Sequence, residues 1–412
     1  AYDRVHLTEF FATRDATKLG MCDEKWFKEH KVSCRINARV EKIDKESGKL
    51  TVKDTKTGKT DEVGYDFCVL ATGSYPFVPP LKNLSMDVVG VFVYRTIEDL
   101  EGMILYAKKC KKAAVIGGGL LGLEAAKAIY DLDQETHVLE MAPYLMPAQL
   151  DEAGGHALQK KIEGMGITVH AGAKISCAVV EDGVFKGLMV SDKDHPEEYL
   201  LELEMLVVSA GIRPRDELGR QCGLAIGQRG GVIVNERMQS SDPKIFAVGE
   251  VASYKGMCYG LIAPGWDQAS VLAKNLEEAT WGLKDKKETS SPAGEAPLYT
   301  GSDLSTKLKL LGVDVASFGR SLDFWFKGQL KEQQAKEQGL SFTLQQDPFS
   351  GLYRKLVFNA EQQLMGGLLV GNAEDYYSLL ALTQKGDLGS KAPVDLFLGG
   401  NAEGDADDLA DD

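Results

Sequence analysis

Cysteine motifs, long apolar runs and an excess of basic residues are all missing from this 412-residue chain. Its seven cysteines are scattered and form no C-x-x-C pair, which argues against a zinc site, an iron–sulfur cluster or a redox-active dithiol. No apolar run is long enough to span a bilayer, and no secretory signal opens the chain. Lys and Arg number 47 against 61 Asp and Glu, and the net charge of −14 argues against nucleic acid or anionic membrane as partners. We therefore expect a cytoplasmic protein with no metal site of its own.

A glycine-rich stretch near the start of the second quarter carries the strongest signal. The apolar run at 113–116 predicts a buried strand, and Gly117, Gly119 and Gly122 follow in the pattern G-x-G-x-x-G. A helical segment and a second strand come next, up to Glu140. In such a unit the first glycine allows a tight turn, the second lets a pyrophosphate approach the helix N-terminus, and the third lets helix and strand pack closely.

The acid that ends the second strand predicts which nicotinamide dinucleotide binds. Glu140 lies 23 residues after Gly117, where a carboxylate can accept hydrogen bonds from the adenine ribose 2′-hydroxyl. No Arg or Lys occurs between Glu140 and Gln149 to receive a 2′-phosphate. The sequence therefore favours NADH over NADPH.

Two further strands end at turns of the kind that hold ligands. A buried strand at 65–70 runs into Ala71-Thr72-Gly73, and a strand at 245–248 delivers Gly249 and Glu250 at its carboxyl end, the usual ligand position in open α/β sheets. Other predicted strands lie at 32–40, 49–53, 167–170 and 205–209, with a hairpin at 176–191; helices are predicted at 96–109, 151–165 and 266–280.

The order of four motifs resembles that of the two-nucleotide flavoprotein reductases, in which an NAD domain interrupts a FAD domain. These motifs are Ala-Thr-Gly at 71–73, G-x-G-x-x-G at 117–122, Gly-Ile-Arg-Pro at 211–214 and Ala-Val-Gly-Glu at 247–250. The stretches at 2–7, 94–100, 221–224 and 304–313 are similar to the flavoprotein portion of assimilatory NAD(P)H-dependent nitrite reductase.

This resemblance implies an α/β fold of the two-dinucleotide-binding reductase type with a small α+β C-terminal domain. The implied domains are a partial FAD domain at 1–112, an NAD domain at 113–234, the second FAD segment at 235–283, a linker at 284–297, the α+β domain at 298–390 and an acidic disordered tail at 391–412.

The resemblance also implies an electron path from NADH through FAD to an iron–sulfur centre and a siroheme, where nitrite becomes ammonium. NADH contacts carried over by position are Gly117, Gly119, Leu120, Leu121, Gly122, Glu124, Glu140 and Gly211. FAD contacts are Arg4, Thr72, Gly73, Gly249 and Glu250, with Pro264 and Trp266 near the isoalloxazine. Trp266 fits a packed core position equally well, and Arg4 fits a surface position. No residue is assigned as an acid, base or nucleophile.

Parts of the family pattern are missing from the sequence. Residues 1–112 contain no G-x-G-x-x-G for the FAD pyrophosphate, and the cysteine clusters of the iron–sulfur and siroheme centres do not occur. We therefore expect a piece cut at both ends, whose partners are the downstream iron–sulfur and siroheme domains of the same parent protein. A homodimer is left open.

Two other functions are compatible with the sequence. One is a stand-alone NADH-dependent reductase of the ferredoxin or rubredoxin type, against which the stretch at 304–313 argues. The other is a non-catalytic NADH-binding fragment, because part of the flavin site is not found in the sequence.

Overall fold

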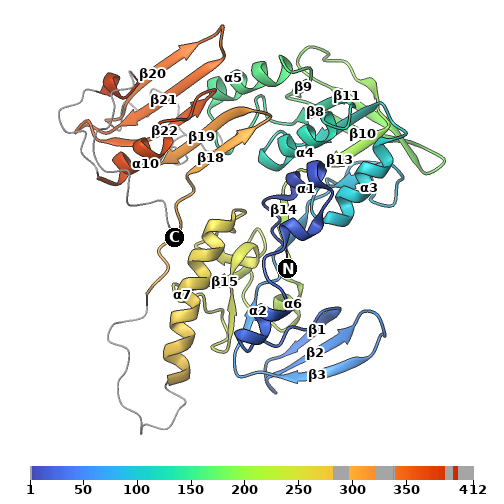
Figure 1. Ribbon diagram of the computed structural model, residues 1–412, viewed down its shortest axis with the longest axis vertical. Coiled ribbons are helices and arrows are strands. Elements are labelled where there is room, and N and C mark those ends of the chain that lie inside the picture. The colour runs from blue at the N-terminus through green and yellow to red at the C-terminus, as the bar shows by residue number, and fades with distance from the viewer. Residues whose placement is uncertain (1, 282–296, 321–336, 338, 386–392, 398–412) are drawn as a thin grey trace. The chain divides into compact units, whose positions relative to one another are not determined.

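A computed structural model describes residues 2–281, 297–320, 337, 339–385 and 393–397 (Figure 1). The chain divides into two compact units, each assembled from separate segments. The first unit contains residues 1–77, 95–97 and 211–303, and the second contains 78–94, 98–210 and 304–412. Among the described residues, no helix is both long and apolar enough to cross a bilayer.

The first unit is built from small sheets whose strands come from distant parts of the sequence. β4 (Cys68–Leu70) pairs in parallel with β16 (Ile245–Ala247), and β15 (Val232–Val234) pairs in parallel with β17 (Ala252–Tyr254). The pair β5 (Ser74–Pro76) and β14 (Ile212–Pro214) is antiparallel, as is the sheet of β1 (Ala38–Asp44), β2 (Lys49–Asp54) and β3 (Thr60–Gly64). Its helices are α1 (Leu7–Thr13), η1 (Ala16–Leu19), α2 (Glu24–Glu29), α6 (Glu217–Gln221), η2 (Gly249–Val251) and α7 (Ile262–Trp281).

The second unit contains the parallel sheet that the central glycine motif predicts. Its order is β6 (Val91–Val93), β13 (Met205–Val208), β7 (Lys112–Ile116), β8 (Glu135–Glu140) and β9 (Thr168–Ala171). The central strands β7 and β13 are apolar and almost wholly buried, as parallel strands covered on both faces should be. The helices are α3 (Ile97–Ala107), α4 (Leu120–Tyr130) and α5 (Glu152–Glu163). Asp151 caps the N-terminus of α5 by accepting a hydrogen bond from the Gly154 N–H at 2.9 Å.

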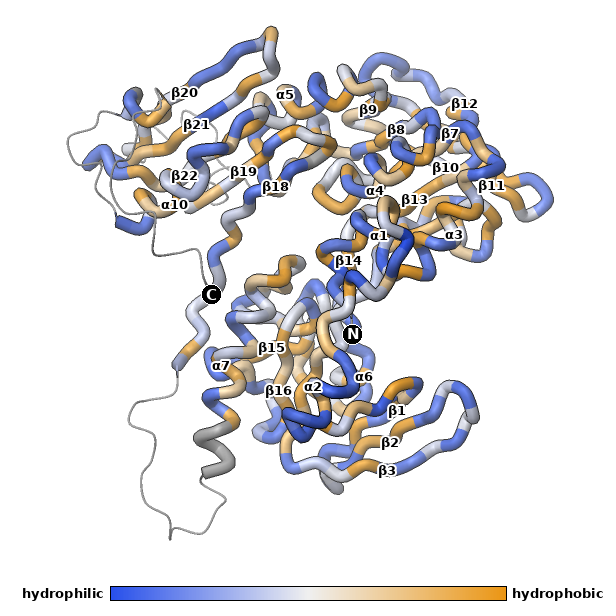
Figure 2. The backbone as a smooth tube through the Cα atoms, in the orientation of Figure 1, coloured by the Kyte–Doolittle hydropathy of each residue, from blue (hydrophilic) through white to orange (hydrophobic). Residues whose placement is uncertain are grey.

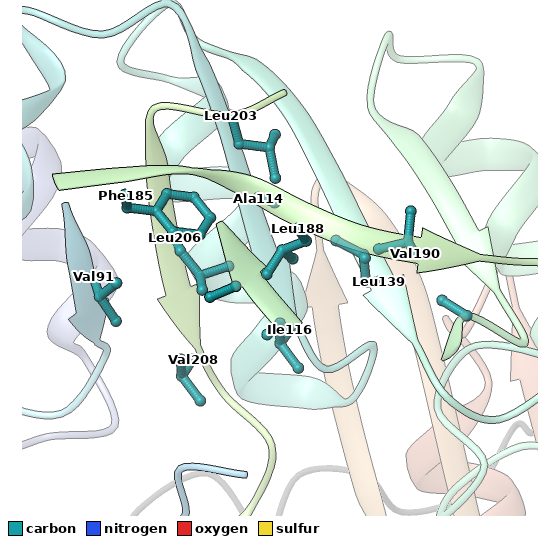
Figure 3. Close-up of a cluster of buried hydrophobic side chains, with 12 residues drawn as sticks. Val91, Ala114, Ile116, Leu139, Phe185, Leu188, Val190, Leu203, Leu206 and Val208 are labelled. Carbon is teal, nitrogen blue, oxygen red and sulfur yellow. The ribbon is translucent and has the colours of Figure 1, made fainter. Parts of the chain in front are cut away.

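A three-stranded antiparallel sheet covers part of the parallel sheet. It consists of β10 (Lys174–Glu181), β11 (Val184–Ser191) and β12 (Tyr199–Glu202). Side chains of β11 such as Phe185 and Leu188 face Leu206 of β13 and Ile116 of β7 in one buried cluster (Figure 3). This cluster therefore buries one face of β7, the strand that runs into the glycine turn.

The C-terminal sheet also belongs to the second unit. Its antiparallel order is β18 (Thr306–Leu310), β19 (Val313–Gly319), β22 (Leu364–Val370), β21 (Leu352–Phe358) and β20 (Ser341–Asp347), with α10 (Tyr376–Lys385) packed on it. Figure 2 shows that the outer strand β20 is largely hydrophilic. The residues of the central strands β21 and β22 are mostly buried. The Tyr353 hydroxyl donates to Asp151 at 2.7 Å, which links β21 to the start of α5.

The structure confirms the α/β class, corrects the starts of two predicted strands and one predicted helix, and adds a strand that was not predicted. The strand predicted at 65–70 begins only at Cys68. The strand predicted at 32–40 begins only at Ala38, because Asn37 adopts a left-handed conformation with φ of 55°. β3 was not predicted, since its sequence is polar and lacks an apolar alternation. The helix predicted to begin at Trp266 begins at Ile262, since Pro264 is tolerated in a first turn where its missing N–H is not needed.

Two predicted ranges are described only in part. The linker predicted at 284–297 lies outside the described residues except for its last residue. Within the acidic tail predicted at 391–412, the described residues form the 3₁₀ helix η4 (Pro393–Phe397). Leu396 and Phe397 of η4 pack against the buried cluster of the C-terminal sheet.

A chain of polar side chains ties the edge strand β9 to the loop between β11 and β12. His137 and His170 stack with ring centroids 5.4 Å apart, and their Nδ1 and Nε2 atoms are 3.1 Å apart. His170 Nδ1 and the Tyr199 hydroxyl contact Asp192 Oδ2 at 3.2 and 3.0 Å. Burial lowers the pKa of His137 despite the opposing effect of Glu135. Burial also acts to raise the pKa of Asp192, but the bonds from His195 N–H, His170 and Tyr199 outweigh it and hold that pKa at about 2.

Asp192→Asn should destabilise the protein at neutral pH and flatten its acid sensitivity. Because the folded-state pKa of Asp192 lies below its ordinary value of 3.8, its contribution is complete above that value and is lost as pH falls towards about 2. The lowering of the Asp192 pKa from 3.8 to about 2 corresponds to about 2 kcal/mol of folding free energy. Urea unfolding at neutral pH and near pH 3 should show this difference. Asp182→Asn, at the exposed β10–β11 turn, is the matched control. Equal pH profiles for the two variants would contradict the assignment.

Candidate functional site

The glycine turn after β7 has the conformation that its sequence predicts. Gly117 has φ of 117°, and a side chain there would overlap the carbonyl oxygen of Ser209. A Cβ on Gly122 would overlap the carbonyl oxygen of Gly117, so the helix packs directly on the turn. Gly119 is the N-cap of α4, and a Cβ there would have no heavy atom of the described residues within 4 Å. The turn is therefore closed on its inner side and open at the helix N-terminus, where backbone N–H groups attract phosphate.

Glu140 holds this turn from the neighbouring strand. Its Oε2 accepts a hydrogen bond from the Gly118 N–H at 2.7 Å, and its Oε1 accepts one from the Ala142 N–H at 2.7 Å. Each carboxylate oxygen keeps a further lone pair for a ligand hydroxyl. Glu140, the residue predicted to bind the ribose, thus also holds the glycine turn in place.

The other residues predicted for NADH lie at different depths. On α4, Leu121 is exposed, whereas Leu120 and Glu124 are half-buried. Gly211 belongs to the first unit, has φ of 102°, and accepts a bond from the Phe77 N–H at 2.8 Å through its carbonyl. Open space surrounds the position of a Cβ on Gly211, so a ligand can approach its backbone.

In the first unit, a compact polar cluster gathers around Glu250. A single oxygen, Oε2, accepts hydrogen bonds from Arg95 at 2.6 Å and from the Ser74 hydroxyl at 2.8 Å, and lies 3.8 Å from the Arg4 guanidinium. The same Arg95 nitrogen donates to the Ser74 hydroxyl at 2.7 Å. The side chains of Arg95 and Glu250 are 11% and 18% exposed, so this is a largely buried ion pair. The other carboxylate oxygen of Glu250 takes no part in these bonds.

The glycines predicted for FAD lie next to this cluster. Gly73 has φ of 67°, and a Cβ there would lie 3.5 Å from Glu250 Oε2. The neighbouring Thr72 hydroxyl donates to the Arg215 carbonyl at 2.7 Å. Gly249 has φ of 74° with open space at its Cβ position, and its N–H donates to Gln268 Oε1 at 2.7 Å.

On α7, the two residues predicted near the isoalloxazine differ in exposure. Pro264 is buried in the first turn, whereas Trp266 is 59% exposed. The alternative of a packed core position for Trp266 is therefore wrong. Arg4 fits its surface alternative, since its side chain is 45% exposed, and its guanidinium also lies 3.8 Å from Glu250 Oε2.

Three residues of this cluster were not predicted from the sequence. Arg95, Ser74 and Gln268 lie 155, 176 and 19 residues from the groups that they bond. For Arg95 a signal existed, because it lies in the Tyr-Arg-Thr stretch that carries the nitrite reductase resemblance. Ser74 directly follows Ala-Thr-Gly, and Gln268 has no local signal.

The pair Arg95 and Glu250 should be strongly coupled in folding. Removing either partner leaves a largely buried charge unpaired, which costs about 3 kcal/mol or more. A double-mutant cycle of Arg95→Ala and Glu250→Ala, followed by urea unfolding, should give a coupling energy of about 1–3 kcal/mol.

Lys49 and Glu62 provide the matched control for this cycle. They are 2.8 Å apart on β2 and β3, with side chains 51% and 65% exposed. Their coupling should stay below about 1 kcal/mol. If the coupling energy of Arg95 and Glu250 is no larger than that of Lys49 and Glu62, burial does not strengthen the ion pair and the prediction is wrong.

Two buried hydrogen-bond donors near Glu250 show whether this cluster fits a bound cofactor. Among the residues that the structure describes, Nε2 of the fully buried Gln268 has no hydrogen-bond partner, and the buried Nε of Arg95 has none either. Buried donors are nearly always paired in native proteins, so these two are left for a ligand or for water. Together with the open backbone at Gly249, they fit a flavin with its carbonyl and hydroxyl acceptors.

The chain contains two nucleotide-binding features. One is the glycine turn with Glu140, and the other is the polar glycine-rich cluster at the ends of two parallel strands. Together they define a two-nucleotide flavoprotein reductase. Residues 6–274 match the pyridine nucleotide-disulphide oxidoreductase family, and the chain belongs to this family of oxidoreductases. Membership implies binding of FAD and NAD(H).

Particular relatives narrow the comparison. The chain is 41% identical to the large subunit of the NAD(P)H nitrite reductase of Klebsiella oxytoca, over 97% of this chain and 37% of that protein. It is 31% identical to the assimilatory nitrate reductase electron transfer subunit of Bacillus subtilis, over 92% of this chain and 44% of that protein. It thus spans less than half the length of these relatives. Among solved structures, an NAD-dependent persulfide reductase from A. fulgidus has a TM-score of 0.75 at 24% identity, covering 94% of this chain and 70% of that one.

Proposed function

We propose that this chain is the NADH-oxidising FAD module of a nitrite reductase, which passes electrons towards an iron–sulfur and siroheme centre. The observation that carries the proposal is the presence of both nucleotide-binding features in a chain 41% identical to a nitrite reductase large subunit over 400 residues. Within this proposal, the downstream iron–sulfur and siroheme domains of the same parent protein are the partners, and NADH is the preferred donor.

The side chains divide the work between binding and orientation. The N-terminus of α4 holds the NADH pyrophosphate, and Glu140 accepts the adenine ribose hydroxyls while keeping the turn closed. Glu250 accepts a ribityl hydroxyl, and Arg95 and Ser74 keep its carboxylate in one orientation. Bound FAD supplies the conversion of a two-electron hydride donor into single electrons.

A second candidate is an electron-transfer subunit that serves a separate terminal reductase. The specific observation in its favour is the 31% identity to the assimilatory nitrate reductase electron transfer subunit over 384 residues. The two candidates share NADH oxidation and differ only in the acceptor.

Anaerobic mixing of NADH with the FAD-loaded chain tests the shared step. We expect NADH to bleach the flavin absorbance, and nitrite added to the reduced chain not to restore it, since no siroheme motif occurs in this sequence. Adding the iron–sulfur and siroheme domains should then yield ammonium. Reoxidation by a separate nitrate reductase instead would favour the second candidate, and a flavin that NADH does not reduce would rule out both.

A further inference from the structure

A pocket with an arginine-rich lining lies in the first unit and has no part in the function described so far. Its volume is about 720 Å³, within the range of sites that hold small ligands. We call it the arginine pocket; its charged and aromatic lining consists of Tyr75, Arg213, Asp216, Glu217, Arg220 and Arg229.

The arginine pocket opens on the opposite face of β5 from the Glu250 cluster. Ser74, which bonds Glu250, is 2% exposed, and the next residue, Tyr75, is 40% exposed. Successive strand residues point to opposite faces. Arg213 pairs with Tyr75 in the β5–β14 ladder, so both side chains lie on the pocket face. The Arg213 guanidinium stacks over the ring of Phe77, two residues along, at 4.0 Å.

A buried carboxylate fixes the floor of the pocket. Asp216 is 6% exposed and accepts both a 2.8 and a 3.0 Å bond from Arg220, plus a 2.6 Å bond from the Gly231 N–H. Gly230 has φ of 91°, and a Cβ there would lie 3.2 Å from the same carboxylate. The charge of Asp216 is therefore matched by Arg220 within the protein.

Two cations of the pocket remain for a ligand. Within the described part of the chain, neither Arg213 nor Arg229 has a carboxylate partner. Only Glu217 among the lining residues opposes them. The lining thus carries three arginines against two carboxylates, and in a chain with a net charge of −14 this local excess of positive charge favours an anion.

We propose that the arginine pocket binds a small polyanion, a molecule with phosphate or carboxylate groups that Arg213 and Arg229 hold and a body that rests against Tyr75. The guanidinium fork suits either anionic group, because both present paired oxygens. This site is additional to the dinucleotide turn and does not depend on the proposed electron path.

Calorimetric titration of the FAD-loaded chain with inorganic pyrophosphate, and separately with citrate, tests the proposal. Saturating NADH is present throughout, so that the turn at Gly119 is occupied. We expect saturable binding of at least one of the two anions. Arg229→Ala and Arg213→Ala should each weaken it by about tenfold. Gln228→Glu, which adds an acid to the lining without removing a cation, should weaken it too.

Lys56→Ala is the control, since it removes a cation of the same unit at the β2–β3 turn, outside the pocket lining. It should leave binding within about twofold, and circular dichroism should show that all variants are folded. The proposal is wrong if neither anion binds saturably, or if the arginine variants bind like the unmodified chain. Arg229-dependent binding of a polyglutamate peptide without binding of either small anion would also overturn it.

Discussion

Gly122→Ala should prevent stable folding of the second unit, whereas Gly119→Ala should leave folding nearly intact and weaken NADH binding at least tenfold. At Gly122 the new methyl group would overlap the carbonyl oxygen of Gly117, which belongs to the turn itself. Neither group can rotate away, so the strand, turn or helix must shift. Overpacking of a well-packed core already costs about 1–3 kcal/mol, and a clash with backbone should reach the upper end of that range or exceed it.

Gly119 provides the matched comparison, because it is in the same turn and receives the same added methyl group. Its φ of −85° suits alanine, and nothing lies within 4 Å of the new Cβ. The loss of a glycine N-cap should cost only about 0.5–1 kcal/mol. The methyl group instead occupies the space in front of the α4 N-terminus that a pyrophosphate needs.

Urea unfolding and NADH fluorescence titration separate the two effects. We expect Gly119→Ala to lower its unfolding midpoint only slightly and to lose at least tenfold in NADH affinity, about 1.4 kcal/mol. Gly122→Ala should lose its cooperative transition. If the two variants behave alike in both measurements, the turn does not have the divided role that we assign to it.

Local sequence rules predicted the dinucleotide unit because each requirement lies within about one supersecondary motif. Gly117, Gly122 and Glu140 act on backbone that is close to them in the sequence or in the adjacent strand. One requirement was still missed. A Cβ on Gly118 would lie 2.5 Å from Leu145 and 2.9 Å from the Glu140 side chain, a contact that only the folded loop after β8 creates.

The Glu250 cluster and the arginine pocket show where sequence reasoning stops. Glu250 was predicted from the strand that delivers it, but Arg95, 155 residues away, was not. The pocket likewise joins Tyr75 to residues beyond position 212 through the β5–β14 pairing. No periodicity or motif encodes such pairings, since residues 78–94 and 98–210 of the second unit separate the paired segments of the first unit in the sequence.

The preference for NADH should depend on the charge of Glu140. A 2′-phosphate brings about two negative charges next to a carboxylate that two backbone N–H groups hold in place, so the carboxylate cannot turn aside. Such like-charge contacts cost several kcal/mol. We expect the unmodified chain to bind NADPH at least tenfold more weakly than NADH.

Glu140→Gln removes this charge and keeps the shape of the side chain. One of its two backbone bonds is lost, because an amide nitrogen cannot accept from an N–H, and stability should fall by about 1 kcal/mol. The ratio of the NADPH to the NADH dissociation constant should fall by about tenfold or more. Glu135→Gln, at the other end of β8 and paired with Lys112 at 3.2 Å, is the control and should leave the ratio unchanged. Fluorescence titration with each reduced nucleotide measures both constants. Equal or tighter binding of NADPH by the unmodified chain would show that Glu140 does not select the nucleotide, and a ratio that moves equally in both variants would assign the effect to the net charge of the strand.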